Sequence, residues 1–166
     1  MDLSKTKFTI NKETNSILVN REFNAPIELV WKAWTDSKIM DLWWAPKPWK
    51  AETKSMNFKE GGSWLYCMLG PAGEKHWACA EFTKIEFQKT YQGIDYFCDE
   101  SGIKNTEFPT TKWENHFSSN NNTTVVNIKL TFSSLSELEK LTEMGFKEGF
   151  AMAHTNLDEL IISKTI

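Results

Sequence analysis

Six cysteine and histidine side chains are the first candidates for metal binding or nucleophilic catalysis: Cys67, Cys79, Cys98, His76, His116 and His154. None of the cysteines forms a Cys-x-x-Cys pair, so their spacing excludes the usual local zinc motif, and we predict no metal site. A catalytic pair can still assemble in space from Cys79 with His76 or His116, because such partners need not be neighbours in sequence. The alternative is that Cys67 and Cys79, which lie in strand-like runs, are small core residues.

Tyr66, His76 and Glu81 are the candidates for general acid–base chemistry, which needs a titratable side chain beside the reacting group. No spacing in the chain pairs two of them into a recognisable catalytic constellation. We therefore assign no catalytic residue and expect no cofactor.

The composition is that of an ordinary globular domain of 166 residues, with 40% hydrophobic residues, 25% charged residues and a net charge of −3. No run approaches the roughly 18 apolar residues of a membrane span, and the net negative charge argues against a general nucleic-acid binder. The first ten residues lack the apolar core of a signal peptide, so we expect a cytoplasmic protein with reduced thiols. The anomaly is the content of eight Trp, because every buried indole N–H needs a partner.

Alternating and turn-bounded segments predict strands that would position these side chains. Residues 7–10 and 17–23 form a first hairpin, and the later runs cover residues 49–58, 63–69, 76–87, 91–98, 111–118 and 123–132. Two short helices are expected between these groups, because Pro26 suits a first helical turn and Asp36 or Ser37 can cap a second helix. Hairpin-connected strands kept apart from helices predict an antiparallel α+β domain that spans residues 1–166.

A helix of roughly 30 residues is predicted after Ser134, which forms a capping box with Glu137. Unbroken, it would measure about 45 Å and would have to lie across the sheet. Gly145 and Gly149 sit on one of its faces. They indicate either close backbone approach or a kink, or else space left for a ligand beside the adaptable side chain of Met152.

Five segments, in the right order along nearly the whole chain, resemble the START-like superfamily, also called SRPBCC, and within it the activator of heat-shock protein 90 ATPase homologue family. They are residues 21–36 (REFNAPIELVWKAWTD), 42–46 (LWWAP), 60–64 (EGGSW), 70–74 (GPAGE) and 144–150 (MGFKEGF). The resemblance implies a helix-grip fold. In that fold a curved antiparallel sheet of about six or seven strands surrounds a long C-terminal helix, and two short helices follow the first strand. The chain departs from the family in having Phe150 where Trp is common and Ala80 near a usual Gly.

The family fold implies a cavity for a small hydrophobic or aromatic molecule between the sheet and the C-terminal helix. The residues expected to line it are Trp64, Tyr66, Met68, His76, Ala80, Phe82, Trp113, Asn115, Phe117, Gly145, Gly149 and Met152. Tyr66, His76 and Asn115 would supply its polar groups, although each also has a purely local reading, as a backbone partner or a solvent-facing side chain. The other Trp residues divide into scaffold (Trp31, Trp34 and Trp43) and rim or interface (Trp44, Trp49 and Trp77).

Binding of such a molecule is the function we expect, and two alternatives stay open. One is an enzyme of the cyclase, hydrolase or isomerase type that uses the same cavity. The other is a chaperone-interacting module, for which Trp44 and Trp49 beside residues 46–48 are the best exposed patch, although nothing matches the additional N-terminal domain of the eukaryotic chaperone activators. Both faces of residues 63–69 are apolar, so we expect the face outside the cavity to be covered either by the short helices or by a second subunit in a homodimer.

Overall fold

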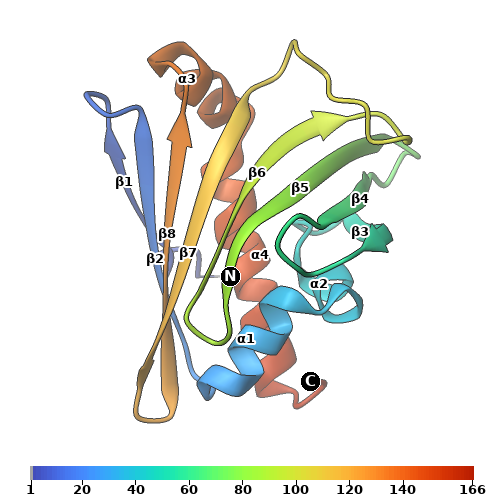
Figure 1. Cartoon of the computed structure of the whole chain (residues 1–166). Helices are drawn as coiled ribbons and strands as arrows, with labels where there is room; N and C mark the ends of the chain where they lie inside the picture. Colours follow the sequence, from blue (N-terminus) through green and yellow to red (C-terminus); the bar gives the residue numbers. More distant parts are fainter. Residues whose placement is uncertain (1) are drawn as a thin grey trace.

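A single curved antiparallel sheet of eight strands forms one side of the protein in the computed structural model, which describes residues 2–166 (Figure 1). The spatial order is β1-β2-β8-β7-β6-β5-β4-β3. The strands are β1 (Lys7–Asn11), β2 (Ser16–Phe23), β3 (Lys50–Met56), β4 (Ser63–Leu69), β5 (Lys75–Glu86), β6 (Thr90–Cys98), β7 (Thr110–Asn120) and β8 (Thr123–Phe132). The α+β helix-grip architecture is therefore confirmed, with more strands than the six or seven expected, because the first hairpin adds both of its strands to the main sheet.

Two short helices, α1 (Ile27–Thr35) and α2 (Ser37–Trp43), carry the chain from β2 to the opposite edge of the sheet at β3. They follow the second strand and not the first, since the opening segment is a hairpin. The Asp36 side chain accepts a hydrogen bond from Lys38 N at 2.9 Å, so this residue caps α2 as predicted. From β3 the chain then meanders back to β8, which pairs with β2.

The predicted long helix is wrong in one respect: it is two helices, α3 (Leu135–Glu143) and α4 (Phe146–Ile162). The chain breaks at Gly145, which has φ of +89° and so lies in the left-handed region that ends helices. The Ser134 cap of α3 is present and accepts from Glu137 N at 3.2 Å. The 17 residues of α4 extend over about 25 Å, little more than half of the expected length.

Buried polar contacts fix α4 inside the grip. The Asn156 amide nitrogen donates to the carbonyl oxygens of Trp43 at 3.3 Å and Ala45 at 3.0 Å, which ties the helix to the end of α2. Arg21 of β2 is only 2% exposed and forms an ion pair with Asp158. These contacts set the height and rotation of α4 against the sheet, because a buried charge or amide without its partner is costly.

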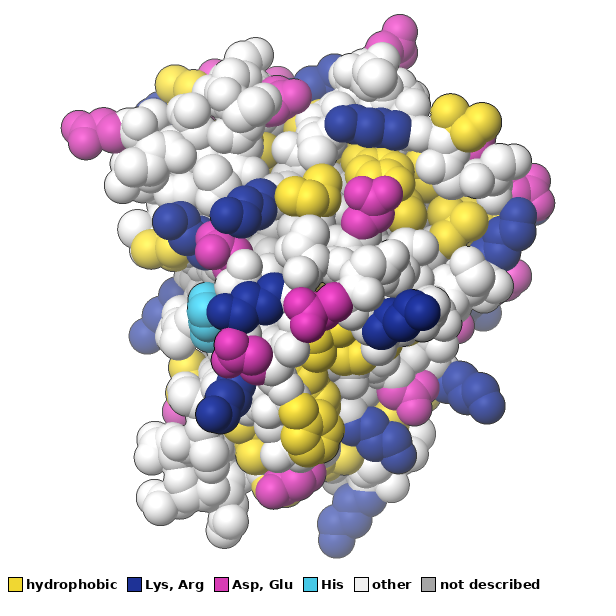
Figure 2. All heavy atoms as spheres, viewed as in Figure 1, with side chains coloured by type: hydrophobic (Ala, Val, Ile, Leu, Met, Phe, Trp, Pro, Cys, Tyr) yellow, Lys and Arg dark blue, Asp and Glu magenta, His cyan; other side chains and the backbone are white. Residues whose placement is uncertain are grey.

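Side chains of the sheet alternate between an inner face toward α4 and an outer face. Figure 2 shows charged side chains of both signs scattered over the side of the molecule seen in Figure 1, with hydrophobic ones between them. Cys67 and Cys79 are buried free thiols on the outer face, so they are packing residues of that layer. Over residues 2–166 no helix is long and apolar enough to cross a membrane.

The two helix glycines differ in backbone conformation, which predicts opposite effects of alanine. Gly145→Ala places a side chain at φ +89° with no neighbour within 4 Å, so the cost is backbone strain of about 1–2 kcal/mol. Gly149→Ala adds a Cβ in ordinary contact with Pro46 Cγ at 3.6 Å inside α4, and we expect a gain of about 0.5–1 kcal/mol. Urea unfolding measures the change in the free energy of unfolding for each variant. If both changes had the same sign, the role given to Gly145 would be contradicted.

Candidate functional site

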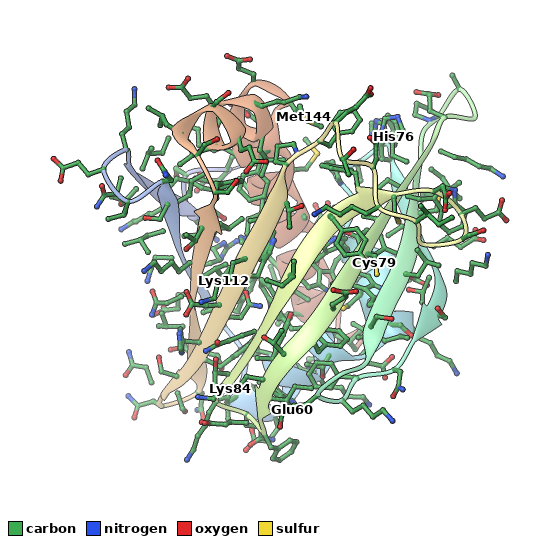
Figure 3. All side chains as sticks on the ribbon, turned by 45° about the horizontal axis from the view of Figure 1, so that its top comes forward. Glu60, His76, Cys79, Lys84, Lys112 and Met144 are labelled. Carbon is green, nitrogen blue, oxygen red and sulfur yellow. The ribbon has the colours of Figure 1, made fainter. Side chains whose placement is uncertain are left out.

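A cleft of about 560 Å³ lies between the inner face of the sheet and the junction of α3 with α4. Strands β4 to β7 form one wall, while Gly145, Phe146 and Gly149 belong to the other. Figure 3 shows Met144 and His76, both cleft residues, at one end of the molecule, and Glu60 and Lys84 at the other. The cleft therefore opens at the end where α3 begins to cover the sheet.

Aromatic rings make most of the inner wall. Phe146 and Phe150 of α4 stack on each other with centroids 5.3 Å apart, and the Trp113 ring of β7 meets Phe150 edge-on at 5.5 Å. Such edge-to-face and offset contacts hold the rings in fixed orientations. Phe150 therefore belongs both to the core and to the cleft wall.

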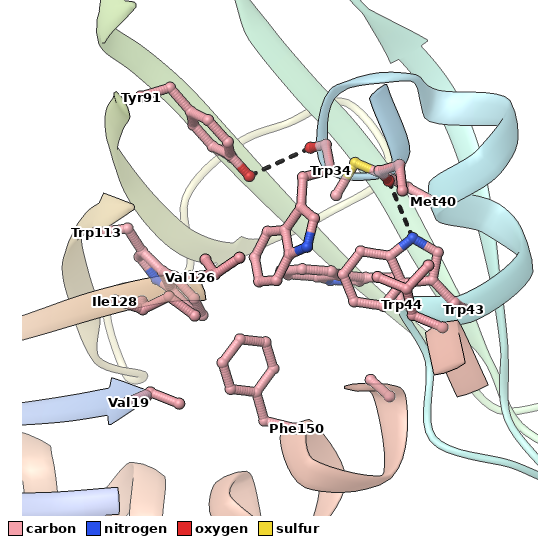
Figure 4. Packing of buried hydrophobic residues seen from close by; sticks show 14 of the residues in the cluster. Val19, Trp34, Met40, Trp43, Trp44, Tyr91, Trp113, Val126, Ile128 and Phe150 are labelled. Atoms are coloured by element: carbon pink, nitrogen blue, oxygen red, sulfur yellow. Dashed lines mark hydrogen bonds between the residues drawn. The ribbon is translucent and has the colours of Figure 1, made fainter. Parts of the chain in front are cut away.

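Trp44 occupies the floor of the cleft and not an exposed patch as expected. It is 9% exposed, and its indole N–H donates to the Tyr66 hydroxyl at 3.1 Å. Its ring lies 5.5 Å from that of Trp64 and 5.8 Å from that of Phe150. Figure 4 shows it beside Trp43, at the centre of the buried cluster. The chain past α2 turns this indole inward, so Trp44 cannot serve as an exposed docking surface.

The rim carries softer and more polar side chains. On the sheet side, the rings of Trp49 and His76 contact each other at a tilt, with their centroids 5.1 Å apart, and His76 is exposed. Met144 stands on the helix side and is 48% exposed. Trp49 is therefore a rim residue, as its sequence position suggested, whereas Trp77 lies on the outer face of β5.

The twelve residues predicted to line the cavity separate into three groups. Those in the cleft are Tyr66, Met68, His76, Trp113, Gly145 and Gly149. A smaller internal cavity next to the cleft collects Trp64, Ala80, Phe82 and Asn115, together with Trp113. Phe117 and Met152 line neither. Phe117 packs against Trp31 in the core at 5.0 Å, and Met152 lies on α4 a turn below the cleft.

The internal cavity measures about 20 Å³, enough for one group the size of a water molecule. Two polar atoms in its lining side chains are buried and have no hydrogen-bond partner among the described residues: Asn115 Oδ1 and Trp34 Nε1. The Asn115 amide nitrogen donates to Tyr91 O at 3.4 Å, which directs its oxygen away from that strand. A buried acceptor left free in this way is unusual and marks the cavity as polar at one point.

Asp95 is the residue that sequence reasoning missed, and it lines both cavities. It lies on β6 opposite Ala80 of β5 and Thr111 of β7. Over residues 2–166 its carboxylate takes part in no ion pair and accepts no side-chain hydrogen bond. Desolvation by the surrounding protein raises the pKa of Asp95 well above its ordinary value of 3.8. The signal was present in the alternation of β6, which puts residue 95 on the same face as Tyr91.

The candidate catalytic pairs do not form. Glu81 is exposed on the outer face, where it accepts from the Tyr96 hydroxyl at 3.1 Å, while His76 stands at the cleft rim. Cys79 also faces outward, so neither His76 nor the cleft is within its reach, and burial raises the pKa of its thiol. Within the part of the chain that the structure describes, no three His, Cys, Asp or Glu side chains gather as metal ligands would.

A second hollow, of about 570 Å³, lies outside the grip between α1 and the turn after β5. Its lining mixes the charged residues Glu28, Lys32 and Asp36 with Phe87, which is 73% exposed. It is a surface groove without the enclosing aromatic walls of the cleft. The cleft is therefore the candidate site.

The Asp95 carboxyl predicts a specific dependence of stability on pH. In the unfolded chain the Asp95 carboxyl ionises near pH 3.8, whereas in the folded protein it keeps its proton to a higher pH. Its contribution to the free energy of unfolding is therefore fully present below pH 3.8, and it is lost as the pH rises through the folded pKa. Asp95→Asn should leave stability unchanged near pH 3.5 and raise it at pH 7, by about 1.4 kcal/mol for each unit of pKa shift. Urea unfolding of the unmodified protein and of Asp95→Asn from pH 3.5 to pH 7 measures this contribution. If the free energies of unfolding of the two proteins depend on pH in the same way, the prediction is wrong.

The chain is similar to proteins of known structure along nearly its whole length. A protein from Arthrobacter aurescens is 30% identical, with a TM-score of 0.90 over 96% of this chain and 93% of that one. Ms6760 from Mycobacterium smegmatis is 26% identical, with a TM-score of 0.87 over 93% and 95% of the two chains. A search of curated proteins found no match. The family model described as "Activator of Hsp90 ATPase homolog 1-like protein" matches residues 24–161, and the chain therefore belongs to that family.

Proposed function

We propose that the cleft binds a small hydrophobic or aromatic molecule. The observation that carries the proposal is the volume of about 560 Å³ enclosed by aromatic walls, with few polar groups among them. Pockets for small molecules have this size and this lining. The proposed contacts are the predicted residues found in the cleft (Tyr66, Met68, His76, Trp113, Gly145 and Gly149), joined by Trp44, Asp95 and Phe150.

Binding is favoured over the two alternatives by the position of individual side chains. An enzyme of the cyclase or hydrolase type needs a positioned acid or base, and among the described residues the Asp95 carboxyl forms no hydrogen bond with Tyr66 or His76, the other candidates in the cleft. A chaperone-interacting module needs an exposed apolar patch, and Trp44 is buried in the cluster.

Two further expectations belong to this proposal. The three free cysteines support a reducing, cytoplasmic location. Leu65 and Leu69, half-buried on the outer face of β4, support a homodimer, which sedimentation velocity of the full chain would detect.

Neutral aromatic and aliphatic probes such as 2-naphthol, indole and decanol test the proposal. We expect at least one to bind with micromolar affinity, quench Trp fluorescence and raise the melting temperature. Gly149→Phe fills the cleft from α4 and should weaken binding at least tenfold. Glu148→Phe adds the same ring at the adjacent exposed position and should leave binding unchanged. If no probe in a broad panel binds, or if both variants behave alike, the cleft is not the site.

A further inference from the structure

Asp95 is the only formally charged side chain that lines the cleft among the described residues. No Lys or Arg shares the lining, and the carboxylate forms no ion pair within residues 2–166. Asp95 is half-buried, and a carboxylate in an aromatic cavity is costly to the folded protein, because it loses hydration without gaining a donor. A ligand that brings a positive charge and N–H donors would remove this cost.

The walls around Asp95 suit a cation as well. Trp44 and Trp113 line both cavities together with Asp95, and Phe150 and Tyr66 stand close by in the cleft. The faces of indole and phenyl rings attract cations, most strongly where water is excluded. An aromatic enclosure with one carboxylate is therefore complementary to an organic ammonium group and unfavourable to a carboxylate ligand.

The small internal cavity sets the size of that group. It holds about 20 Å³ and borders Asp95 on one side and Asn115 on the other. Asn115 is 2% exposed, and its Oδ1 is a free acceptor. A primary ammonium is about as large as a water molecule and carries three donors, so it can serve both the Asp95 carboxylate and this oxygen.

We propose that the cleft takes a primary amine with an apolar or aromatic body, its ammonium group bound by Asp95 and Asn115 and its body lying along Trp113, Phe146 and Phe150 toward the rim. This inference rests on the proposed function and specifies its ligand class. The raised pKa of Asp95 adds a signature, because a bound ammonium lowers that pKa and binding therefore releases protons.

Other titratable groups line the two cavities. Tyr66 from β4, and Tyr91 and Tyr96 from β6, have pKa values raised by burial, so all three stay protonated across neutral pH. His76 from β5 stands at the rim. The remaining neighbours are uncharged: Trp34 from α1, Trp44 after α2, Thr111 and Asn115 from β7, and Phe146 and Phe150 from α4.

Three probes with one body test the proposal: 2-(naphthalen-2-yl)ethylamine, the matching alcohol and naphthalen-2-ylacetic acid. Titration calorimetry at pH 7 should show the amine at least tenfold tighter than the alcohol, and the acid weakest. Repeating the amine titration in phosphate and Tris buffers, whose ionisation enthalpies differ, should reveal proton release on binding of the amine.

Asp95→Asn should abolish the preference for the amine and the proton release while keeping affinity for the alcohol, which also shows that the variant folds. Glu81→Gln is the matched control, since it changes an acid of the same sheet on the outer face, and it should behave as the unmodified protein. If the alcohol binds wild-type protein as well as the amine, or Asp95→Asn keeps the preference, the amine inference is wrong and the proposed function stands. If no probe binds, both fall.

Discussion

The position of the Trp44 indole is the constraint on which both the core and the cleft depend. Its N–H donates to the Tyr66 hydroxyl, and its ring meets those of Trp34, Trp64 and Phe150. Trp44 thereby joins α1, the sheet and α4. Because buried aromatic clusters are packed to crystal-like density, the floor of the cleft is rigid, and its shape is fixed before any ligand arrives.

Against this rigid floor, Asp95 has a clear physical meaning. A folding core would place an apolar side chain opposite Ala80, since a desolvated carboxyl lowers stability. Arg21, which is 2% exposed, has its ion-pair partner in Asp158, so it belongs to the scaffold. A buried charged residue with a partner belongs to the scaffold, whereas a carboxyl that lines a cavity without a partner is a candidate for ligand contact.

The sequence predicted most of the fold because strand periodicity and turn residues are local signals. Residues 63–69 were predicted to the residue, and the cap of α3 at Ser134 was correct. A kink at Gly145 or Gly149 was one of the predicted alternatives, but a full break was not, because the apolar spacing continues across Gly145 and only its left-handed φ ends the helix. Trp44 was misplaced for a related reason: the direction of a side chain in the irregular segment after α2 follows from tertiary packing. Six of the twelve residues predicted to line a cavity lie in the cleft, since alternation gives the face of a residue but not its depth.

The break at Gly145 explains why a cleft exists in this fold. The segment after the break, α4, packs against α2, whereas α3 packs against β8. One straight helix of 30 residues would follow a single line over the sheet, but the two segments cover separate regions and meet at Met144 and Gly145. Near this junction the cleft lies between the helices and the inner faces of β4 to β7, and aromatic residues of both form its walls. Gly145, whose positive φ ends α3 at little cost, is thus also part of the cleft that Asp95 lines.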